Sequence, residues 1–152
     1  MKKLIFILFS VLLSLNVLAQ NSQTDSAQIK NVINKMFDGM RKGDSSIVSS
    51  TFAKGMILQT IRMNGDSVSV ESEDPGKFLT SVGTKHTQVY DERITFKSIL
   101  IDANMASVWT DYQFYLGDKF SHCGVNSFQL VKGQKGWQIV YIIDTRRKDD
   151  CN

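Results

Sequence analysis

The sequence predicts an α+β domain, with N-terminal helices packed on a strongly curved antiparallel sheet that forms a conical pocket. Apolar residues recur at helical spacing early in the chain, whereas turn signals divide the stretch from Glu92 to Arg147 into four consecutive strands. At 152 residues and 42% hydrophobic content, the chain is long enough for one core. Helices followed by a run of strands favour a sheet with one face covered by helices.

The segment from Met1 to Ala19 has the pattern of a signal peptide. Lys2 and Lys3 precede an apolar run, Leu4 to Val17, which is shorter than the roughly 20 residues of a membrane span. We therefore expect residues 20–152 to form a single domain that is periplasmic or secreted and makes no membrane contact after cleavage.

Charge and composition argue against two classes of partner. Cleavage removes Lys2 and Lys3 and leaves 16 basic residues against 15 acidic ones, so no nucleic-acid partner is expected. The chain holds only two histidines, His86 and His122, and its two cysteines lack zinc-site spacing. We expect no metal and no cofactor.

The first helix is predicted by N-cap candidates at Thr24 to Ser26 and by a stop at Gly43. Its apolar positions recur at helical spacing: Ile29, Val32, Ile33, Met36, Phe37 and Met40. Asp44 is the cap candidate of a second, short helix. That helix is expected to bury three apolar residues before Gly55, namely Ile47, Val48 and Phe52.

A hairpin and a third helix follow. The turn Asn64-Gly65-Asp66 joins the predicted strands Met56 to Arg62 and Ser67 to Glu71. Pro75, with Asp74 as its cap, is typical of a first helical turn. The buried side of this helix is predicted to be Phe78, Leu79 and Val82, and the loop Gly83 to Gln88 is expected to leave His86 exposed.

The four strands are paired by their turns, which are Asp102-Ala103-Asn104, Gly117-Asp118 and Gly133 to Gly136. Closing these turns predicts four pairs that matter for the site: Trp109 with Ser98, Asp111 with Phe96, Gln113 with His122 and Asn126 with Ile143. Strand side chains alternate between faces, so a slip of one residue at any turn exchanges the two faces of that strand.

This alternation assigns side chains to an inner and an outer face. The inner face is predicted to hold Glu92, Ile94, Phe96, Ser98, Leu100, Trp109, Asp111, Gln113, Tyr115, Phe120, His122, Asn126, Phe128, Leu130, Trp137, Ile139, Tyr141, Ile143 and Arg147. The outer face is predicted to expose Tyr112, Val125, Val131, Val140 and Ile142 among polar residues.

Two inner-face residues are candidate catalytic groups. Asp111 and His122 would be diagonal neighbours in one hairpin, where a carboxylate can orient an imidazole for proton transfer. Tyr115 or Tyr141 would then donate a hydrogen bond to a developing oxyanion. The alternative is a buried polar network in which Asp111, His122 and Asn126 satisfy one another.

The remaining polar and aromatic inner-face residues are candidates for ligand binding: Trp109, Gln113, Tyr115, Asn126, Phe128, Tyr141 and Arg147. Their rings would suit a flat, partly apolar ligand, or they are simply core. Arg147 would hold an anionic group, unless it forms an ion pair with Glu92 or Asp111.

Cys123 is placed on the outer face, and Cys151 lies a few residues beyond the end of the neighbouring strand. A tail that folds back would join them in a disulfide, which would fix the C-terminus rather than take part in chemistry. The alternative is two free thiols.

The order of helix, short helix, hairpin, short helix and four long strands resembles the nuclear transport factor 2-like superfamily, whose cone fold is also called cystatin-like. That superfamily includes ketosteroid isomerase, scytalone dehydratase and polyketide cyclases. More narrowly, four runs resemble secreted bacterial members labelled lumazine-binding: Val108 to Tyr115, Phe120 to Leu130, Trp137 to Ile139 and Asp144 to Arg147. The resemblance implies a cone-shaped pocket and pairing of two copies through the outer sheet face.

Three functions remain open at this point. The first is binding of a small organic ligand in an aromatic-lined cone. The second is a cofactor-independent isomerase, dehydratase or cyclase that transfers protons with Asp111 and His122. The third is an association module in which the outer face forms a homodimer. Because one fold hosts unrelated activities, the resemblance does not choose among them.

Overall fold

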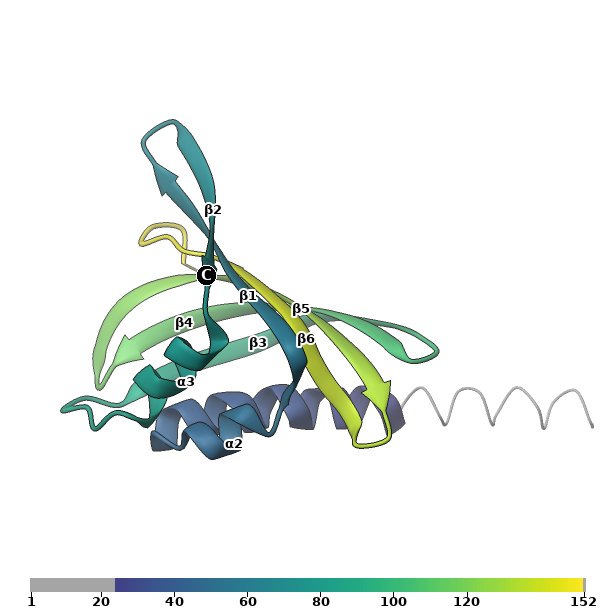
Figure 1. Ribbon diagram of the computed structural model, residues 1–152. Coiled ribbons are helices and arrows are strands. Elements are labelled where there is room, and N and C mark those ends of the chain that lie inside the picture. Colours follow the sequence, from purple (N-terminus) through teal and green to yellow (C-terminus); the bar gives the residue numbers. More distant parts are fainter. Residues whose placement is uncertain (1–23, 152) are drawn as a thin grey trace, which may run out of the picture.

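The computed structural model describes residues 24–151 (Figure 1). A helix covers residues 24–42 and is followed by α2 (Ser45–Ser49), β1 (Phe52–Asn64), β2 (Ser67–Glu73) and α3 (Pro75–Gly83). Four long strands complete the chain: β3 (Tyr90–Asp102), β4 (Met105–Leu116), β5 (Lys119–Gly133) and β6 (Gly136–Thr145). The predicted signal peptide, Met1 to Ala19, lies outside the described residues. Within 24–151, no helix is long and apolar enough to span a membrane.

The predicted end of the first helix and the predicted starts of α2 and α3 are confirmed. The predicted extent of the second helix is wrong, because α2 ends at Ser49 and Phe52 already belongs to β1. The first helix ends before Gly43, which has a φ of 65° that favours glycine. Asp44 caps α2, because its carboxylate accepts from the backbone amides of Ser46 and Ile47. Asp74 caps α3 by accepting from the Lys77 amide at 2.8 Å, with proline in the first turn.

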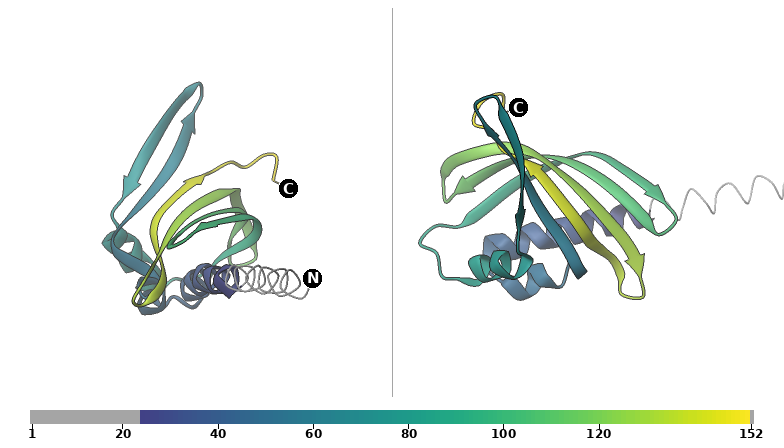
Figure 2. Two further views of the ribbon diagram at one scale, coloured as in Figure 1. Left: turned by 90° about the vertical axis from the view of Figure 1, so that its right-hand side faces the viewer. Right: turned by 45° about the horizontal axis from the view of Figure 1, so that its top comes forward.

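The six strands form one sheet in the order β2-β1-β6-β5-β4-β3. Strands β3 to β6 form the predicted antiparallel meander, but β1 pairs with β6 in parallel. Strand β1 is also longer than the predicted Met56 to Arg62. At its far end Asn64 pairs with Ser67, and this β1–β2 hairpin extends beyond the rest of the sheet as an exposed arm (Figures 1 and 2).

The curved sheet wraps over the first helix, and the core lies between them (Figure 2). The buried side chains at its centre come from both layers: Ile29, Ile33, Met36, Phe37, Val108, Phe128, Leu130 and Ile139. The rings of Phe37 and Phe128 meet edge to face, with centroids 6.2 Å apart. This packing explains the predicted apolar helix face and the inward position of the middle of β5.

Three β-bulges change the predicted register. Lys97, Ser121 and Val140 are each an extra residue without a partner on the adjacent strand. An extra residue exchanges the two faces of everything beyond it, because side chains alternate along a strand. The turns themselves close as predicted, since Leu116 pairs with Lys119 and Tyr115 with Phe120, as does Trp109 with Ser98.

Several predicted pairs are therefore wrong by one residue. His122 pairs with Phe114 rather than Gln113, Phe96 pairs with Thr110 rather than Asp111, and Asn126 pairs with Asp144 rather than Ile143. The predicted inward face of β4 is likewise wrong. Its outward residues include Trp109, Asp111, Gln113 and Tyr115, whereas Ala106, Val108, Thr110, Tyr112 and Phe114 point inward.

The outer face also differs from the prediction. Tyr112 and Ile142, which were expected there, are 3% and 5% exposed and belong to the inner side. Leu100, expected inside, is 68% exposed on the outer side. The bulges at Lys97 and Val140 account for the exchanges on β3 and β6.

The C-terminal tail is attached to the outer side of β5. Cys123 and Cys151 form a disulfide, and the backbone of Arg147 pairs with that of Cys123. The end of β6 passes close to Gly124 on β5, where a Cβ would lie 1.8 Å from the carbonyl oxygen of Thr145. Only glycine permits this approach, so Gly124 and the disulfide together set the path of the last residues.

Candidate functional site

A cavity of about 210 Å³ lies between the first helix, α3 and the concave face of the sheet. We call it the cone pocket. Its apolar lining consists of Met36, Phe37, Met40, Leu58, Phe78, Phe114 and Ile142. Its polar lining consists of Glu73, Tyr90, Glu92, Tyr112, His122, Asn126, Asp144 and Arg146. A cavity that combines apolar walls with converging polar groups is typical of a small-molecule site.

Glu92 is the central carboxyl group of this pocket. It lies on β3, and the amide nitrogen Nδ2 of Asn126 on β5 donates to its Oε1 at 2.7 Å. Burial raises the pKa of Glu92 to about 7, and the charge of Asp144 adds to that increase. A carboxyl group that titrates near neutrality exchanges a proton readily at physiological pH, as a general acid or base must.

Asp144 is the anionic centre of a hydrogen-bond cluster at the end of β6. Its carboxylate accepts from Thr60 Oγ1 at 2.5 Å and from Arg146 Nε at 2.8 Å. The hydroxyl of Tyr112 lies 2.8 Å from the carbonyl oxygen of Thr145 and 3.2 Å from Asp144 Oδ2, so these two acceptors share its proton. Burial and the Asp144 charge raise the pKa of Tyr112, which keeps the phenol protonated.

His122 supplies a neutral imidazole. Burial lowers its pKa, and the charge of Arg146 lowers it further. Its ring lies 5.0 Å from that of Phe114 and 5.7 Å from that of Tyr112, measured between centroids. Nδ1 is 3.1 Å from Ser121 Oγ. The imidazole is therefore held by aromatic contacts rather than by a carboxylate.

The predicted pair of Asp111 and His122 is not brought together. Asp111 points to the outer face, where its carboxylate forms an ion pair with Lys97 Nζ at 3.0 Å. Among the predicted binding residues, Asn126 lines the cone pocket and Phe128 is fully buried in the core. The proposed network of Asp111, His122 and Asn126 therefore does not form either.

Four predicted binding residues lie on the outer side. Trp109 is 48% exposed, and the hydroxyl of Tyr115 donates to Gln113 Oε1 at 3.0 Å. The hydroxyl of Tyr141 donates to Gln59 Oε1 at 2.7 Å, on the neighbouring strand.

The contacts of Arg147 and His86 also differ from the prediction. Arg147 donates to the carbonyl of Asp150 in the tail and does not reach Glu92 or Asp111. His86 is not free in its loop, because Nε2 lies 2.6 Å from the Ser81 carbonyl oxygen and its ring packs on Tyr90.

Sequence reasoning missed Tyr112, Asp144 and Arg146 as pocket residues, and it considered Glu92 only as an ion-pair partner. One signal would have found the correct face of β4. Its even-numbered residues from 106 to 114 are Ala, Val, Thr, Tyr and Phe, whereas the odd-numbered set contains Ser, Asp and Gln. The more apolar set identifies the buried face.

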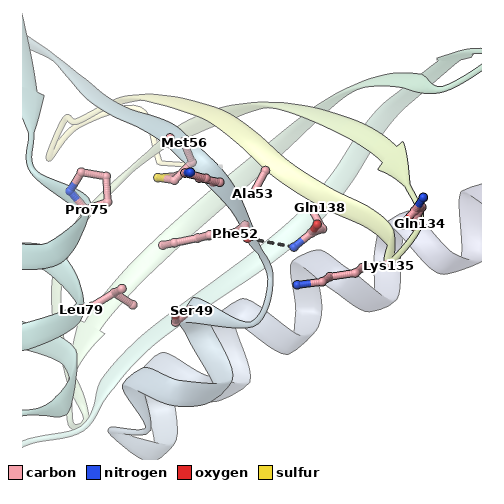
Figure 3. Close-up of a pocket in the computed structure, with 11 residues that line it drawn as sticks. Ser49, Phe52, Ala53, Met56, Pro75, Leu79, Gln134, Lys135 and Gln138 are labelled. Atoms are coloured by element: carbon pink, nitrogen blue, oxygen red, sulfur yellow. Dashed lines mark hydrogen bonds between the residues drawn. The ribbon is translucent and has the colours of Figure 1, made fainter.

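A wider groove of about 820 Å³ lies outside the cone, between the start of β1, α3 and the β5–β6 turn (Figure 3). Gln138 Nε2 donates to the Phe52 carbonyl oxygen at 2.9 Å along this groove. Its charged lining is limited to Lys54 and Lys135, and no carboxylate or imidazole lines it. We therefore place the candidate site in the smaller cone pocket, where the titratable groups converge. Within 24–151, no cluster of three or more His, Cys, Asp or Glu residues could hold a metal ion.

No protein-family profile and no curated protein matches the sequence. Solved structures do match. An NTF2-like protein of unknown function from Shewanella baltica aligns with a TM-score of 0.66 at 17% identity, over 83% of this chain and 96% of its own. An NTF2-like protein with a cystatin-like fold from Novosphingobium aromaticivorans aligns with a TM-score of 0.69 at 8% identity, over 88% and 89%. The chain has the nuclear transport factor 2-like fold. A further NTF2-like protein of unknown function, from Methylobacillus flagellatus, aligns with a TM-score of 0.64 at 15% identity, over 82% and 93%.

These comparisons confirm the predicted fold class and the predicted likeness to NTF2-like proteins. At identities of 8% to 17% they concern the fold alone. The narrower resemblance to lumazine-binding members stays a prediction.

Proposed function

We propose that this NTF2-like protein binds a small organic molecule in the cone pocket. The observation that carries the proposal is the convergence of Glu92, His122 and Asn126 on one cavity with apolar walls. Its volume of about 210 Å³ is smaller than the roughly 300–1,000 Å³ typical of drug-sized ligands, so the ligand has few atoms.

Methionine methyl NMR tests this proposal directly. Met36 and Met40 line the cone pocket, whereas Met63 and Met105 are 73% and 54% exposed elsewhere. In protein carrying ¹³C-methyl methionine, a bound fragment is expected to shift the Met36 and Met40 signals and leave the other two in place. A fragment library that shifts neither pocket methionine would contradict the proposal.

A second candidate function is cofactor-independent proton transfer, and the raised pKa of Glu92 favours it. In this reaction the Glu92 carboxylate takes a proton from carbon beside a carbonyl group, and the carboxylic acid returns it at another position. The neutral imidazole of His122 is a hydrogen-bond donor for the enolate oxygen. Glu92 thus replaces the pair of Asp111 and His122 as the proposed catalytic group.

Hydrogen–deuterium exchange tests this second function without knowledge of the product. Small ketones and aldehydes are incubated with the protein in D₂O, and loss of the C–H signal is followed by proton NMR. We expect exchange with the wild type and none with Glu92→Gln. Equal rates in both proteins would exclude Glu92 as the base.

We also propose that the protein works in the periplasm or outside the cell. The pattern of Met1 to Ala19 and the disulfide between Cys123 and Cys151 support this location, because disulfides persist in oxidising compartments. The intact mass of protein isolated from the periplasm or the medium checks both points. A chain that retains residues 1–19 and remains in the cytoplasm would contradict the proposal.

An association role is supported by the outer sheet face, which exposes Leu100, Met105, Trp109 and Val131. Pairing places these side chains on one side of the sheet, since Met105 pairs with Val131, and Trp109 with Ser98. We propose that two copies associate through this face. Size-exclusion chromatography with light scattering is expected to show a dimer that Trp109→Lys converts to a monomer. A wild-type monomer at high concentration would contradict it.

A further inference from the structure

Aromatic rings form a continuous wall of the cone pocket. The ring of Phe114 lies 5.9 Å from that of Tyr90 and 5.0 Å from that of His122, which in turn lies 5.7 Å from Tyr112. Phe37 from the first helix and Phe78 from α3 line the same cavity. The faces of Phe and Tyr rings attract a cation, and this attraction is strongest where water is excluded.

The charged side chains of the pocket also favour a cation, because carboxylates outnumber cationic groups in the lining. Arg146 is the one cationic side chain in the lining, and its charge is already paired with Asp144 at 2.8 Å. Within residues 24–151, Glu92 forms no ion pair with any lysine or arginine, and its hydrogen bond comes from the neutral amide of Asn126. Glu73 adds another carboxylate to the lining. An anion entering this pocket would meet more negative than positive charge.

We propose that the ligand of the cone pocket is a small organic cation, an alkylammonium group held against the aromatic wall with Glu92 as its counter-ion. The inference rests on the proposed binding function and specifies the ligand class. The cavity volume of about 210 Å³ limits the ligand to a compact amine or quaternary ammonium compound.

Cation binding is coupled to the ionisation of Glu92. The groups that face it are Tyr112 on β4, His122 and Asn126 on β5, and Asp144 and Arg146 at the end of β6, with Glu73 on β2. Tyr90 on β3 also lines the pocket. The first helix and α3 line it with apolar side chains, and Arg41 on the first helix donates to the backbone carbonyl oxygen of Glu92 at 3.4 Å. A bound cation stabilises the carboxylate form, so affinity rises with pH up to about 7 and then levels off.

Three probes of nearly the same shape separate charge from size. Choline is positive, 3,3-dimethylbutan-1-ol is its neutral counterpart, and 3,3-dimethylbutanoate is negative. Calorimetric titration at pH 8 is expected to show choline binding at least about tenfold more tightly than the alcohol, and no binding of the carboxylate. The methyl signals of Met36 and Met40 report whether each probe occupies the pocket.

Two variants identify the groups responsible. Glu92→Gln is expected to lower the affinity ratio of choline to the alcohol, and Phe114→Leu to reduce choline affinity by about fivefold or more. Asp111→Asn, which alters an outer-face carboxylate paired with Lys97, is the control and is expected to preserve both affinities. Methionine methyl spectra of each variant confirm that the fold is retained.

The outcomes distinguish this inference from the function on which it depends. Equal affinity for choline and the alcohol, or tighter binding of the carboxylate, would overturn the cation class and leave a pocket that binds neutral or anionic compounds. An unchanged preference in Glu92→Gln would overturn the role of that carboxylate. If none of these probes and no library fragment shifts Met36 or Met40, the proposed binding function fails as well.

Discussion

Asn126 on β5 donates its side-chain amide to Glu92 on β3 at 2.7 Å, across the intervening strand β4. The contact connects two strands that share no backbone hydrogen bonds. It also orients a carboxyl group whose pKa burial raises to about 7. The geometry of the candidate site therefore depends on the register of three strands at once.

Glu92 should make the stability of the protein depend on pH. Its pKa is about 7 in the fold and near 4.5 in the unfolded chain, so the folded state holds the proton more tightly between these values. The free energy of unfolding should fall as pH rises from about 5 to about 7, by about 2 kcal/mol for this group. Urea denaturation at pH 5 and pH 8 measures the loss.

Glu92→Gln should remove this part of the pH dependence and be the more stable protein at pH 8. The difference between wild type and variant isolates Glu92, because His122, whose pKa is lowered, is common to both. Glu71→Gln in the exposed arm, where Glu71 pairs with Arg62, is the matched control. Parallel curves for wild type and Glu92→Gln would show that the carboxyl group titrates normally.

Asn126→Ala should raise the pKa of Glu92 above about 7. The Asn126 hydrogen bond lowers that pKa by favouring the charged carboxylate. Without this hydrogen bond, the increase in pKa caused by burial is less opposed. A titration of the ¹³C-labelled glutamate carboxyl signal measures the change. Gln129→Ala removes an amide that donates to Ser107 Oγ on the outer face, and it should leave the Glu92 titration in place.

Asp144 and Asp111 should respond very differently to replacement by asparagine. Asp144 is 8% exposed and pairs with Arg146, so Asp144→Asn leaves a partly buried guanidinium unpaired. We expect a loss of about 3 kcal/mol in the free energy of unfolding, the lower end of the range for buried pairs, because Arg146 keeps 36% of its side chain exposed. Asp111→Asn breaks an exposed pair with Lys97 and should cost less than about 1 kcal/mol.

Urea unfolding of the two variants provides the comparison. Asp144→Asn should also lower the pKa of Glu92, because a neighbouring negative charge is removed. Equal destabilisation by both substitutions would contradict the assignment of Asp144 to the interior.

The disulfide between Cys123 and Cys151 should stabilise the protein by about 2–4 kcal/mol, since it closes a sequence separation of 28 residues. The variant Cys123→Ala/Cys151→Ser and the wild type under reducing agent should lose this amount in urea unfolding. The variant in reducing agent is the control and should change no further. Retention of wild-type stability after reduction would show that the tail is held by its other contacts.

The helices, the caps and the turns were predictable because each depends on local chemistry. Asp44 and Asp74 cap their helices, and Gly43 ends the first helix, at the positions that the sequence predicts. The bulges at Lys97, Ser121 and Val140 have no such local signature, because they accommodate the curvature of the whole sheet.

Each bulge reverses the faces of the residues beyond it. The predicted positions of the candidate site residues were affected most. The prediction placed Asp111 beside His122, whereas the structure places Tyr112 there. The parallel pairing of β1 with β6 was also missed, because it joins strands far apart in the sequence.

That pairing has a consequence for the order in which the molecule assembles. The hydrogen bond between Thr60 and Asp144 spans 84 residues of chain, and contacts of such long range form late because their loop closure is entropically costly. The meander can form from its local hairpins while β1 is still unattached. We therefore expect the contacts among the meander strands to form before the hydrogen-bond cluster around Asp144 is completed by Thr60.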